Sequence, residues 1–248
     1  MLIEETVDRL IQMKFTGMVE AFRKALEEPA WRELSFPERF ALIVEEEWRV
    51  RRERARARRL KEASFRHHAR LEEVTVKKRR GLDKETFIEL SQSRWLEQHR
   101  PVLITGFTGS GKTYLSCALG EKACREGYRV KYWRAGRLLE EFRLSRLEGR
   151  WMKLLAKLAR YDLLILDDWG TWELTESGRR DLLEIIEDRS GLKATIISTQ
   201  IPVNGWHEML GGDTIADSIL DRLIHGAIRV DLKSKVSMRV TDGKEQEA

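Results

Sequence analysis

The chain has 248 residues, 35% of them charged and 42% apolar, and its formal net charge is +5. No apolar run approaches the ~20 residues of a membrane-spanning helix, and the N-terminal residues lack the charged-then-apolar pattern of a signal peptide. The two cysteines, Cys117 and Cys124, match no disulfide framework or metal-binding spacing, so we predict a cytoplasmic protein that does not enter a membrane.

Residues 2–48 are predicted to be helical, because apolar side chains recur there at helical spacing. Pro29 ends the first helical stretch, and Ser35 followed by Pro37 and Glu38 is typical of a new helix start. The apolar faces exceed what a solvated arm needs, so we expect them to pack against each other, a second copy or another protein.

Positive charge is concentrated in residues 49–80, which hold 14 Lys or Arg against 4 Asp or Glu. This local net charge of +10 leaves −5 for the rest of the chain, a distribution that indicates a polyanionic partner. A solvated helix with internal ion pairs is the alternative interpretation. The candidate DNA-binding residues are Arg51, Arg52, Arg54, Arg56, Arg58, Arg59, Lys77, Lys78, Arg79 and Arg80.

From residue 83 onwards, short apolar runs alternate with amphipathic stretches, which predicts an α/β fold with a parallel sheet flanked by helices. The helical patterns lie near 112–126, 136–147, 151–160, 177–190 and 215–225. The predicted strands are Val102–Thr105, Arg129–Trp133, Leu163–Asp167, Thr195–Thr199 and Ala227–Val230.

Residues 106–113, GFTGSGKT, match the phosphate-binding pattern G-x-x-x-x-G-K-[ST] completely. The glycines allow backbone N–H groups to point at phosphate oxygens, and the following helix adds its positive end. Lys112 is expected at the β- and γ-phosphates of ATP, and Thr113 at Mg²⁺. The candidate nucleotide-binding residues are Gly106, Thr108, Gly109, Ser110, Gly111, Lys112, Thr113 and Tyr114.

Two acidic residues, Asp167 and Asp168, follow the apolar strand Leu163–Leu166, at the edge of a parallel sheet where ligands bind. We expect Asp167 to bind Mg²⁺ and Asp168 to orient or deprotonate the attacking water. A carboxylate in the second position favours hydrolysis over transfer to a small acceptor.

Two further segments carry candidate catalytic residues. Thr199 and Gln200 end the apolar strand that begins at Thr195, and either could sense the γ-phosphate by hydrogen bonding. Arg222 lies in an amphipathic helical pattern, and it is a candidate arginine finger for a neighbour's ATP. From the residues alone, an internal ion pair with Asp221 or an ion pair at the surface is an equally good interpretation of Arg222.

These motifs together resemble the IstB transposition helper family, AAA+ ATPases encoded beside the transposase in one class of bacterial insertion sequences. The specific segments are LLILDDWG (163–170), ISTQIPVNGWHEML (197–210) and TIADSILDRLIHGA (214–227). The resemblance covers residues 83–235 well and residues 1–82 in overall layout. The DnaC-type helicase loaders share the ATPase architecture and are the second resemblance.

The resemblance implies an AAA+ module that forms a ring or filament around or along double-stranded DNA, with ATP between subunits. Lys112, Thr113 and Asp167 match the phosphate and metal positions, Gln200 or Thr199 the sensor, and Arg222 the finger. The implied function is sequence-tolerant binding and remodelling of target DNA, followed by recruitment and stimulation of the cognate transposase. The domains would be a helical N-terminal domain at 1–65, a basic linker at 66–82, the ATPase at 83–240 and a tail at 241–248.

Two departures from the AAA+ pattern qualify this interpretation. Most AAA+ proteins carry Glu after the metal-binding Asp, whereas Asp168 is one methylene shorter, so hydrolysis is expected to be slow or sensitive to geometry. Only 18 residues follow Val230, too few for a helical lid. A helicase loader that binds duplex DNA weakly, and a nucleotide switch that barely hydrolyses ATP, are the alternatives; a small-molecule kinase is disfavoured because it would need a lid and an acceptor pocket.

Overall fold

The computed structural model describes residues 2–77 and 81–233. The chain divides into two compact units, Met1–Arg58 and Arg59–Ala248, and each is described by itself. No helix in the described part of the chain is long and apolar enough to cross a bilayer.

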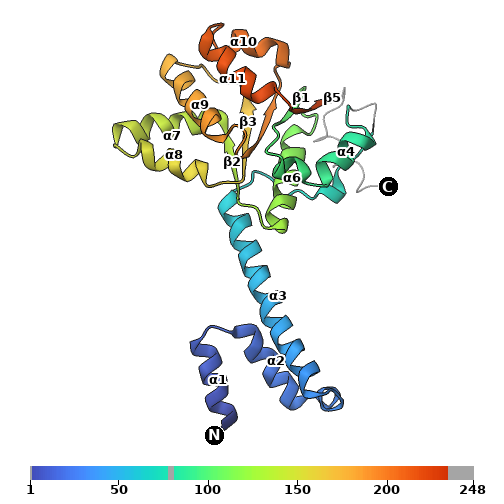
Figure 1. The fold of residues 1–248 in the computed structure, drawn as a ribbon. Coiled ribbons are helices and arrows are strands. Elements are labelled where there is room, and N and C mark those ends of the chain that lie inside the picture. Colours follow the sequence, from blue (N-terminus) through green and yellow to red (C-terminus); the bar gives the residue numbers. More distant parts are fainter. Residues whose placement is uncertain (1, 78–80, 234–248) are drawn as a thin grey trace. The chain divides into compact units, whose positions relative to one another are not determined.

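The first unit consists of helices, as the periodicity predicts. It contains α1 (Leu2–Gln12), α2 (Thr16–Glu27), the 3-10 turn η1 (Pro29–Glu33) and most of α3 (Phe36–Ala63) (Figure 1). At the predicted helix start, the Glu38 carboxylate accepts hydrogen bonds from the Ser35 amide at 2.7 Å and the Ser35 hydroxyl at 2.6 Å. The burial of these groups is low, so this contact acts locally to fix the entry into α3.

The Glu47 carboxylate joins α3 to the start of α2. Its Oε2 accepts hydrogen bonds from the amides of Gly17 at 2.7 Å and Met18 at 3.1 Å, and its Oε1 pairs with Arg51 at 2.6 Å. A Cβ at Gly17 would lie 2.8 Å from the Glu47 Cα, so only glycine permits this approach. Amides at the start of a helix lack partners within the helix, and Glu47 supplies the missing acceptor.

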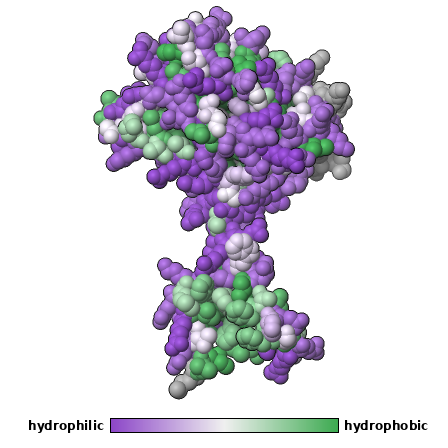
Figure 2. Space-filling model, in the orientation of Figure 1, coloured by the Kyte–Doolittle hydropathy of each residue, from purple (hydrophilic) through white to green (hydrophobic). Residues whose placement is uncertain are grey.

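Much of the apolar surface of the first unit stays exposed. Its buried apolar side chains are small or few: Val7, Val19, Ala21 and Ile43. Figure 2 shows the consequence as hydrophobic surface over this unit. The exposed large apolar residues are Leu2, Ile3, Ile11, Met13, Leu26, Phe36, Phe40, Leu42, Val44 and Trp48.

The second unit is built on a five-stranded sheet in which every described pairing is parallel. The strand order is β2-β3-β4-β1-β5, so the first strand lies between the last two. The strands are β1 (Val102–Gly106), β2 (Val130–Arg134), β3 (Leu163–Trp169), β4 (Ala194–Thr199) and β5 (Ile228–Leu232).

Helices cover both faces of this sheet (Figure 1). One face packs against η2 (Leu71–Glu73), α4 (Lys84–Ser91), α5 (Arg94–Glu97) and α6 (Lys112–Glu126). The other packs against α7 (Ala135–Leu147), α8 (Trp151–Ala159), α9 (Glu176–Arg189), η4 (Val203–Gly205), α10 (Trp206–Met209) and α11 (Thr214–Ile224).

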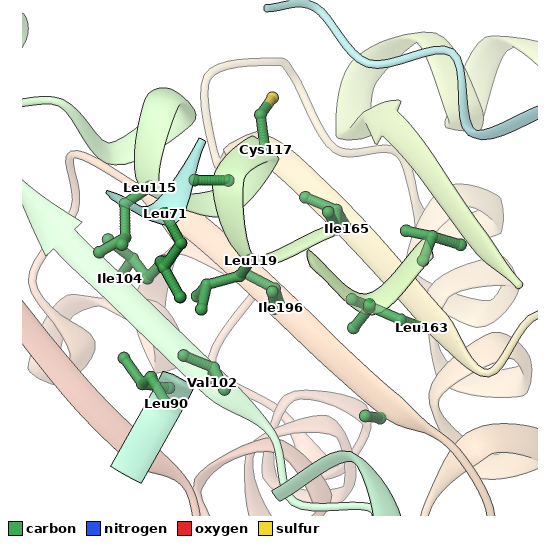
Figure 3. Packing of buried hydrophobic residues seen from close by; sticks show 14 of the residues in the cluster. Leu71, Leu90, Val102, Ile104, Leu115, Cys117, Leu119, Leu163, Ile165 and Ile196 are labelled. Atoms are coloured by element: carbon green, nitrogen blue, oxygen red, sulfur yellow. The ribbon is translucent and has the colours of Figure 1, made fainter. Parts of the chain in front are cut away.

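Alternate residues of each strand point to opposite faces, as strand geometry requires. On β1, Val102 and Ile104 enter the core beneath α6, whereas Leu103 enters the core beneath α7 to α11. Figure 3 shows the first of these cores, in which Leu115 and Leu119 of α6 pack on the strand residues. Both faces of the strands are therefore buried, which explains their nearly continuous apolar sequence.

The observed strands confirm the predicted α/β fold and lie within two residues of the predicted bounds at each end. The prediction that no helical lid follows β5 concerns residues 234–248, which lie outside the described part of the chain. The predicted linker comprises residues 66–82. Three of its residues are buried in the core beneath α6: Ala69, Leu71 and Leu82.

Candidate functional site

The loop between β1 and α6 has the backbone conformation of a phosphate-binding loop. Gly106, Gly109 and Gly111 have φ values of 146°, 79° and 95°, a region that side chains with a Cβ rarely adopt. A Cβ at Gly106 would also lie 2.4 Å from the Leu232 carbonyl oxygen. The amide groups at the start of α6 thus face an open site with the positive end of the helix behind them.

A cavity of about 680 Å³ opens above this loop. The predicted nucleotide-binding residues from Thr108 to Tyr114 line it, together with Asp168 and Gln200. Most of the remaining wall comes from the segment before the sheet. These residues are Arg66, His67, His68, Glu73, Val74, Thr75 and Leu82.

Tyr114 connects the segment before the sheet to the start of α6, directly after the phosphate-binding loop. Its hydroxyl donates a 2.5 Å hydrogen bond to Glu73 Oε2. His67 and His68 are exposed on the same wall. No nucleotide-binding motif in the sequence includes residues 66–75, because their place at the cavity depends on their folding back over α6.

Asp167 is buried at the carboxyl end of β3, beside the loop helix. The Thr113 hydroxyl donates to its Oδ2 at 2.9 Å, and the Tyr132 hydroxyl donates to the same atom at 2.6 Å. The Ser198 hydroxyl of β4 also donates to Asp167. Three strands and α6 therefore converge on one carboxylate. Burial, together with the hydrogen bond to Asp167, raises the pKa of Tyr132.

Asp168 occupies a bulge in β3. The register with β4 shifts between Leu166 and Trp169, and Asp168 has a φ of 56°, which turns its side chain out of the sheet. Its Oδ2 lies 2.8 Å from Arg134 Nε and 3.5 Å from Arg66 Nη1. The predicted catalytic carboxylate is thus at the cavity wall, but two guanidinium groups surround it.

Gln200 and Thr199 are the two candidates for the sensor, and they have different surroundings. Gln200 Oε1 accepts a 2.7 Å hydrogen bond from Thr108 of the phosphate-binding loop and lines the cavity. Thr199 is fully buried, donates to the Trp169 carbonyl oxygen at 2.6 Å and accepts from the Ile201 amide at 3.0 Å. Only Gln200 presents its side chain to the site.

Lys112 is held inside the loop. Its Nζ donates to the carbonyl oxygens of Gly106 at 2.8 Å and Phe107 at 2.9 Å. Burial lowers the pKa of Lys112, and the charges of Asp167 and Asp168 oppose that shift. A phosphate oxygen could replace both carbonyl acceptors without moving the lysine out of the site.

Arg222 lies away from this cavity. It lines a second cavity of about 510 Å³ beside Pro101 and Thr195, at the amino ends of β1 and β4. Its guanidinium bonds Glu187 Oε1 at 2.7 Å and the Ser218 carbonyl oxygen at 2.8 Å. Within one subunit, Arg222 therefore lies at the amino ends of the strands, whereas the phosphate-binding loop lies at their carboxyl ends.

The predicted DNA-binding arginines of α3 differ in how far they are engaged. Arg51 pairs with Glu47, Arg56 lies 3.4 Å from Glu53, and Arg59 donates to the Cys124 carbonyl oxygen at 2.9 Å. Arg54 and Arg58 are exposed, and no described residue forms an ion pair or hydrogen bond with either. Lys77 is exposed, whereas Lys78, Arg79 and Arg80 lie outside the described residues.

The remaining described arginine of the α3 group, Arg52, lies over the Trp48 ring with 6.0 Å between guanidinium carbon and ring centroid. Trp48 is 57% exposed, so this contact leaves the arginine at the surface. Three of the α3 arginines are thus available to an external anion without breaking a described ion pair or hydrogen bond: Arg52, Arg54 and Arg58.

Comparisons with known proteins agree with these features. An insertion sequence ATP-binding protein of Sinorhizobium fredii is 45% identical over 95% of this chain and 96% of its own. Another, from Pseudomonas fluorescens, is 39% identical over 82% of this chain and 88% of its own. These matches confirm the predicted family and the predicted ATP-binding ATPase class.

Solved structures show the same fold. The DnaC helicase loader superposes with a TM-score of 0.57 at 20% identity, covering 66% of this chain and 97% of that one. AMPPCP-bound DnaA from Aquifex aeolicus gives a TM-score of 0.58 at 24% identity, covering 71% of this chain and 53% of that one. The model of the family described as IstB-like ATP binding protein matches residues 8–246, and the chain therefore belongs to that family.

Proposed function

We propose that the protein is an ATP-dependent transposition helper that assembles on target DNA and presents it to a transposase. The observation that carries this proposal is the convergence of Thr113, Asp168 and Gln200 on one cavity, with Asp167 hydrogen-bonded to Thr113 beneath it, in a chain of the insertion-sequence ATP-binding family. The relatives take their names from insertion sequences, and the basic surface of α3 supplies a site for the DNA.

The donor set fits Mg²⁺ bound with ATP. The Thr113 hydroxyl and the Asp167 carboxylate are adjacent oxygen ligands of the kind this hard cation prefers. No cluster of three or more His, Cys, Asp or Glu side chains at metal-binding spacing occurs among the residues described, so the nucleotide's own oxygens would complete the coordination. Bound Mg²⁺ would neutralise charge on the phosphates.

Hydrolysis would use Asp168 and Gln200. Asp168 would accept a proton from the attacking water. Gln200, which already contacts the loop through Thr108, would form a hydrogen bond with the terminal phosphate. Asp168 pairs with Arg134, so that guanidinium would have to move aside before the carboxylate could take up the attacking water. Slow basal turnover follows, and partners that loosen the pair would accelerate it.

Arg222 would complete the site of a neighbouring subunit. Its position at the opposite sheet edge prevents it from reaching the phosphates of its own subunit without refolding α11. A head-to-tail arrangement would place one subunit's Arg222 against the next subunit's cavity. ATP would then hold neighbouring subunits together as a ring or filament.

The experiment that tests the shared site is a mixing assay. Arg222→Ala subunits keep the phosphate-binding loop, and Lys112→Ala subunits keep the arginine, so each alone should be nearly inactive. A mixture should regain a substantial part of the wild-type ATPase rate, since some interfaces pair an intact loop with an intact arginine. If the mixture stays as inactive as its components, Arg222 does not act across an interface.

The DNA proposal is tested by the mass of the complex on a duplex of about 50 base pairs. A large discrete assembly should form with ATP, and it should be lost with ADP or in Lys112→Ala. A protein that stays small on DNA in every nucleotide state would contradict the proposal. A stable complex with a replicative helicase would then favour the helicase-loader alternative.

A further inference from the structure

Arg66 is a cationic residue in the wall of the cavity, although it lies outside every nucleotide-binding motif. It lines the cavity above the phosphate-binding loop, and its side chain is 39% exposed. Its only described ion-pair partner is Asp168, at 3.5 Å from Nη1 to Oδ2. That separation is too long for a good hydrogen bond, so the guanidinium keeps most of its donors for another acceptor.

The same Asp168 oxygen already has a closer partner. Arg134 Nε donates to Oδ2 at 2.8 Å, and this contact alone neutralises the carboxylate. Two arginines thus share one carboxylate. Of these two arginines, only Arg66 lines the cavity. The positive charge that Asp168 does not neutralise is therefore presented to the cavity by Arg66.

The backbone at Arg66 is fixed against the loop helix. The neighbouring Phe65 ring packs so tightly on α6 that a Cβ at Gly120 would lie 2.6 Å from it. Ala63 and Ala69 on either side are buried in the core beneath α6. The side chain of Arg66 therefore projects from an anchored segment, and it can change partners by rotamer changes alone.

We propose that Arg66 is a triphosphate ligand of its own subunit, which leaves Asp168 for the terminal phosphate when ATP binds. This rests on the proposed function, in which the cavity holds ATP with its terminal phosphate next to Asp168. A phosphate group carries more charge than a carboxylate, and a guanidinium binds it with two parallel hydrogen bonds. ADP has no terminal phosphate, so Arg66 would favour ATP over ADP.

The test is the dissociation constants of ATP and ADP, each with Mg²⁺, measured by fluorescence with labelled nucleotides on the full chain. Arg66→Ala should weaken ATP binding about tenfold to a hundredfold and leave ADP binding within about twofold, the range expected for losing a charge-assisted hydrogen bond. Arg66→Lys should recover part of the loss. Arg70→Ala removes an equal charge from the same segment outside the cavity, and it should change neither constant.

Each outcome bears on one proposal. Equal weakening of ATP and ADP in Arg66→Ala, or no weakening of either, would overturn the assignment of Arg66 while leaving nucleotide binding intact. Failure of the wild-type chain to bind ATP, or equal ATP affinity in wild type and Lys112→Ala, would overturn the proposed function instead. Melting temperatures of both alanine variants show whether the fold is preserved.

Discussion

The Thr113 hydroxyl lies 2.9 Å from Oδ2 and 3.1 Å from Oδ1 of Asp167, although the two residues are 54 positions apart in the sequence. This pair lies at the inner edge of the candidate nucleotide site. Thr113→Ala should remove the Mg²⁺ dependence of ATP affinity and lower the ATPase rate at least about a hundredfold, as loss of one electrostatic contact to the reacting group does. Calorimetric titration of ATP with and without Mg²⁺ measures this; a Mg²⁺ effect as large as in wild type would contradict it.

Replacing the two sensor candidates should separate catalysis from stability. Gln200→Ala removes a side chain at the cavity, so it should lower the ATPase rate with little change in melting temperature. Thr199→Val leaves the Ile201 amide without its acceptor, which should cost about 1–3 kcal/mol of unfolding free energy. Paired measurement of rate and thermal unfolding decides between them. A stable, inactive Thr199→Val protein would instead make Thr199 the sensor.

Glu47 should make the first unit sensitive to acid. Burial raises the pKa of this carboxyl, but the hydrogen bond from Arg51 and the amides of Met18 and Gly17 outweigh burial, and the pKa falls below its usual value. Stability from a lowered folded pKa is complete above the unfolded value of about 4.3 and is lost as pH falls through the folded value.

Hydrogen exchange of the α2 amides measures this effect on the intact chain. Protection should be constant from pH 7 to pH 5 after correction for intrinsic exchange, and it should decrease below about pH 4. Glu47→Gln should lower protection at neutral pH and flatten the acid dependence. Glu46→Gln, whose carboxylate pairs with Arg49 on the same helix, is the matched control. Unchanged protection in Glu47→Gln would refute the role given to Glu47.

Arg189 should be essential for stability and dispensable for chemistry. It is 2% exposed, and its guanidinium donates to the carbonyl oxygens of Leu158, Tyr161 and Ala194 and to the Thr195 hydroxyl. Burial lowers the pKa of Arg189 to about 10, so it remains charged at neutral pH. It joins the end of α9 to α8 and to the start of β4.

Arg189→Met should destabilise the chain by about 3–5 kcal/mol, since several buried acceptors lose their donor at once. Denaturant unfolding measures the loss, and Arg180→Ala, an exposed residue of the same helix paired with Glu176, should cost less than about 0.5 kcal/mol. Equal denaturant midpoints for Arg189→Met and Arg180→Ala would contradict this prediction. They would show that water forms the hydrogen bonds to the carbonyl groups that lose Arg189.

The proposed contact between α3 and DNA should be measurable in the salt dependence of DNA affinity. Arg54→Ala with Arg58→Ala should reduce the slope of log affinity against log salt concentration by about 2, because each phosphate contact contributes about 0.9. The double variant Arg143→Ala with Arg180→Ala removes the same charge from exposed pairs on α7 and α9. Identical slopes for both double variants would mean that Arg54 and Arg58 do not contact phosphates.

Local patterns were sufficient to predict the strands and several of the residues that line the candidate site. The run from Leu163 to Asp168 combines a buried strand with acidic residues at its end, and the glycine spacing of the loop leaves few alternatives. The sequence predicts Gln200 and Thr199 together as sensor candidates, because it does not show which of two adjacent side chains faces the site. That direction depends on the bulge in the neighbouring strand β3. The motifs therefore predict which residues approach the phosphates, without fixing their partners.

The partners depend on distant contacts that no local pattern encodes. Arg66 and Arg134 meet Asp168 only because the segment before the sheet folds over α6 and because β2 is paired with β3. Arg189 looks like an ordinary charged residue of an amphipathic helix, and its burial follows from the packing of α8 and β4 around it. Charge in the sequence predicts exposure, and the exceptions are set by tertiary structure.

The place of β1 between β4 and β5 also determines when the protein can become active during synthesis. Translation proceeds at about 5–20 residues per second, and the strand that carries the phosphate-binding loop pairs with partners some 90 and 125 residues downstream. The loop therefore leaves the ribosome many seconds before the strands that support it. Nascent chains should not bind ATP until β5 has emerged, which keeps unfinished subunits out of any assembly that ATP holds together.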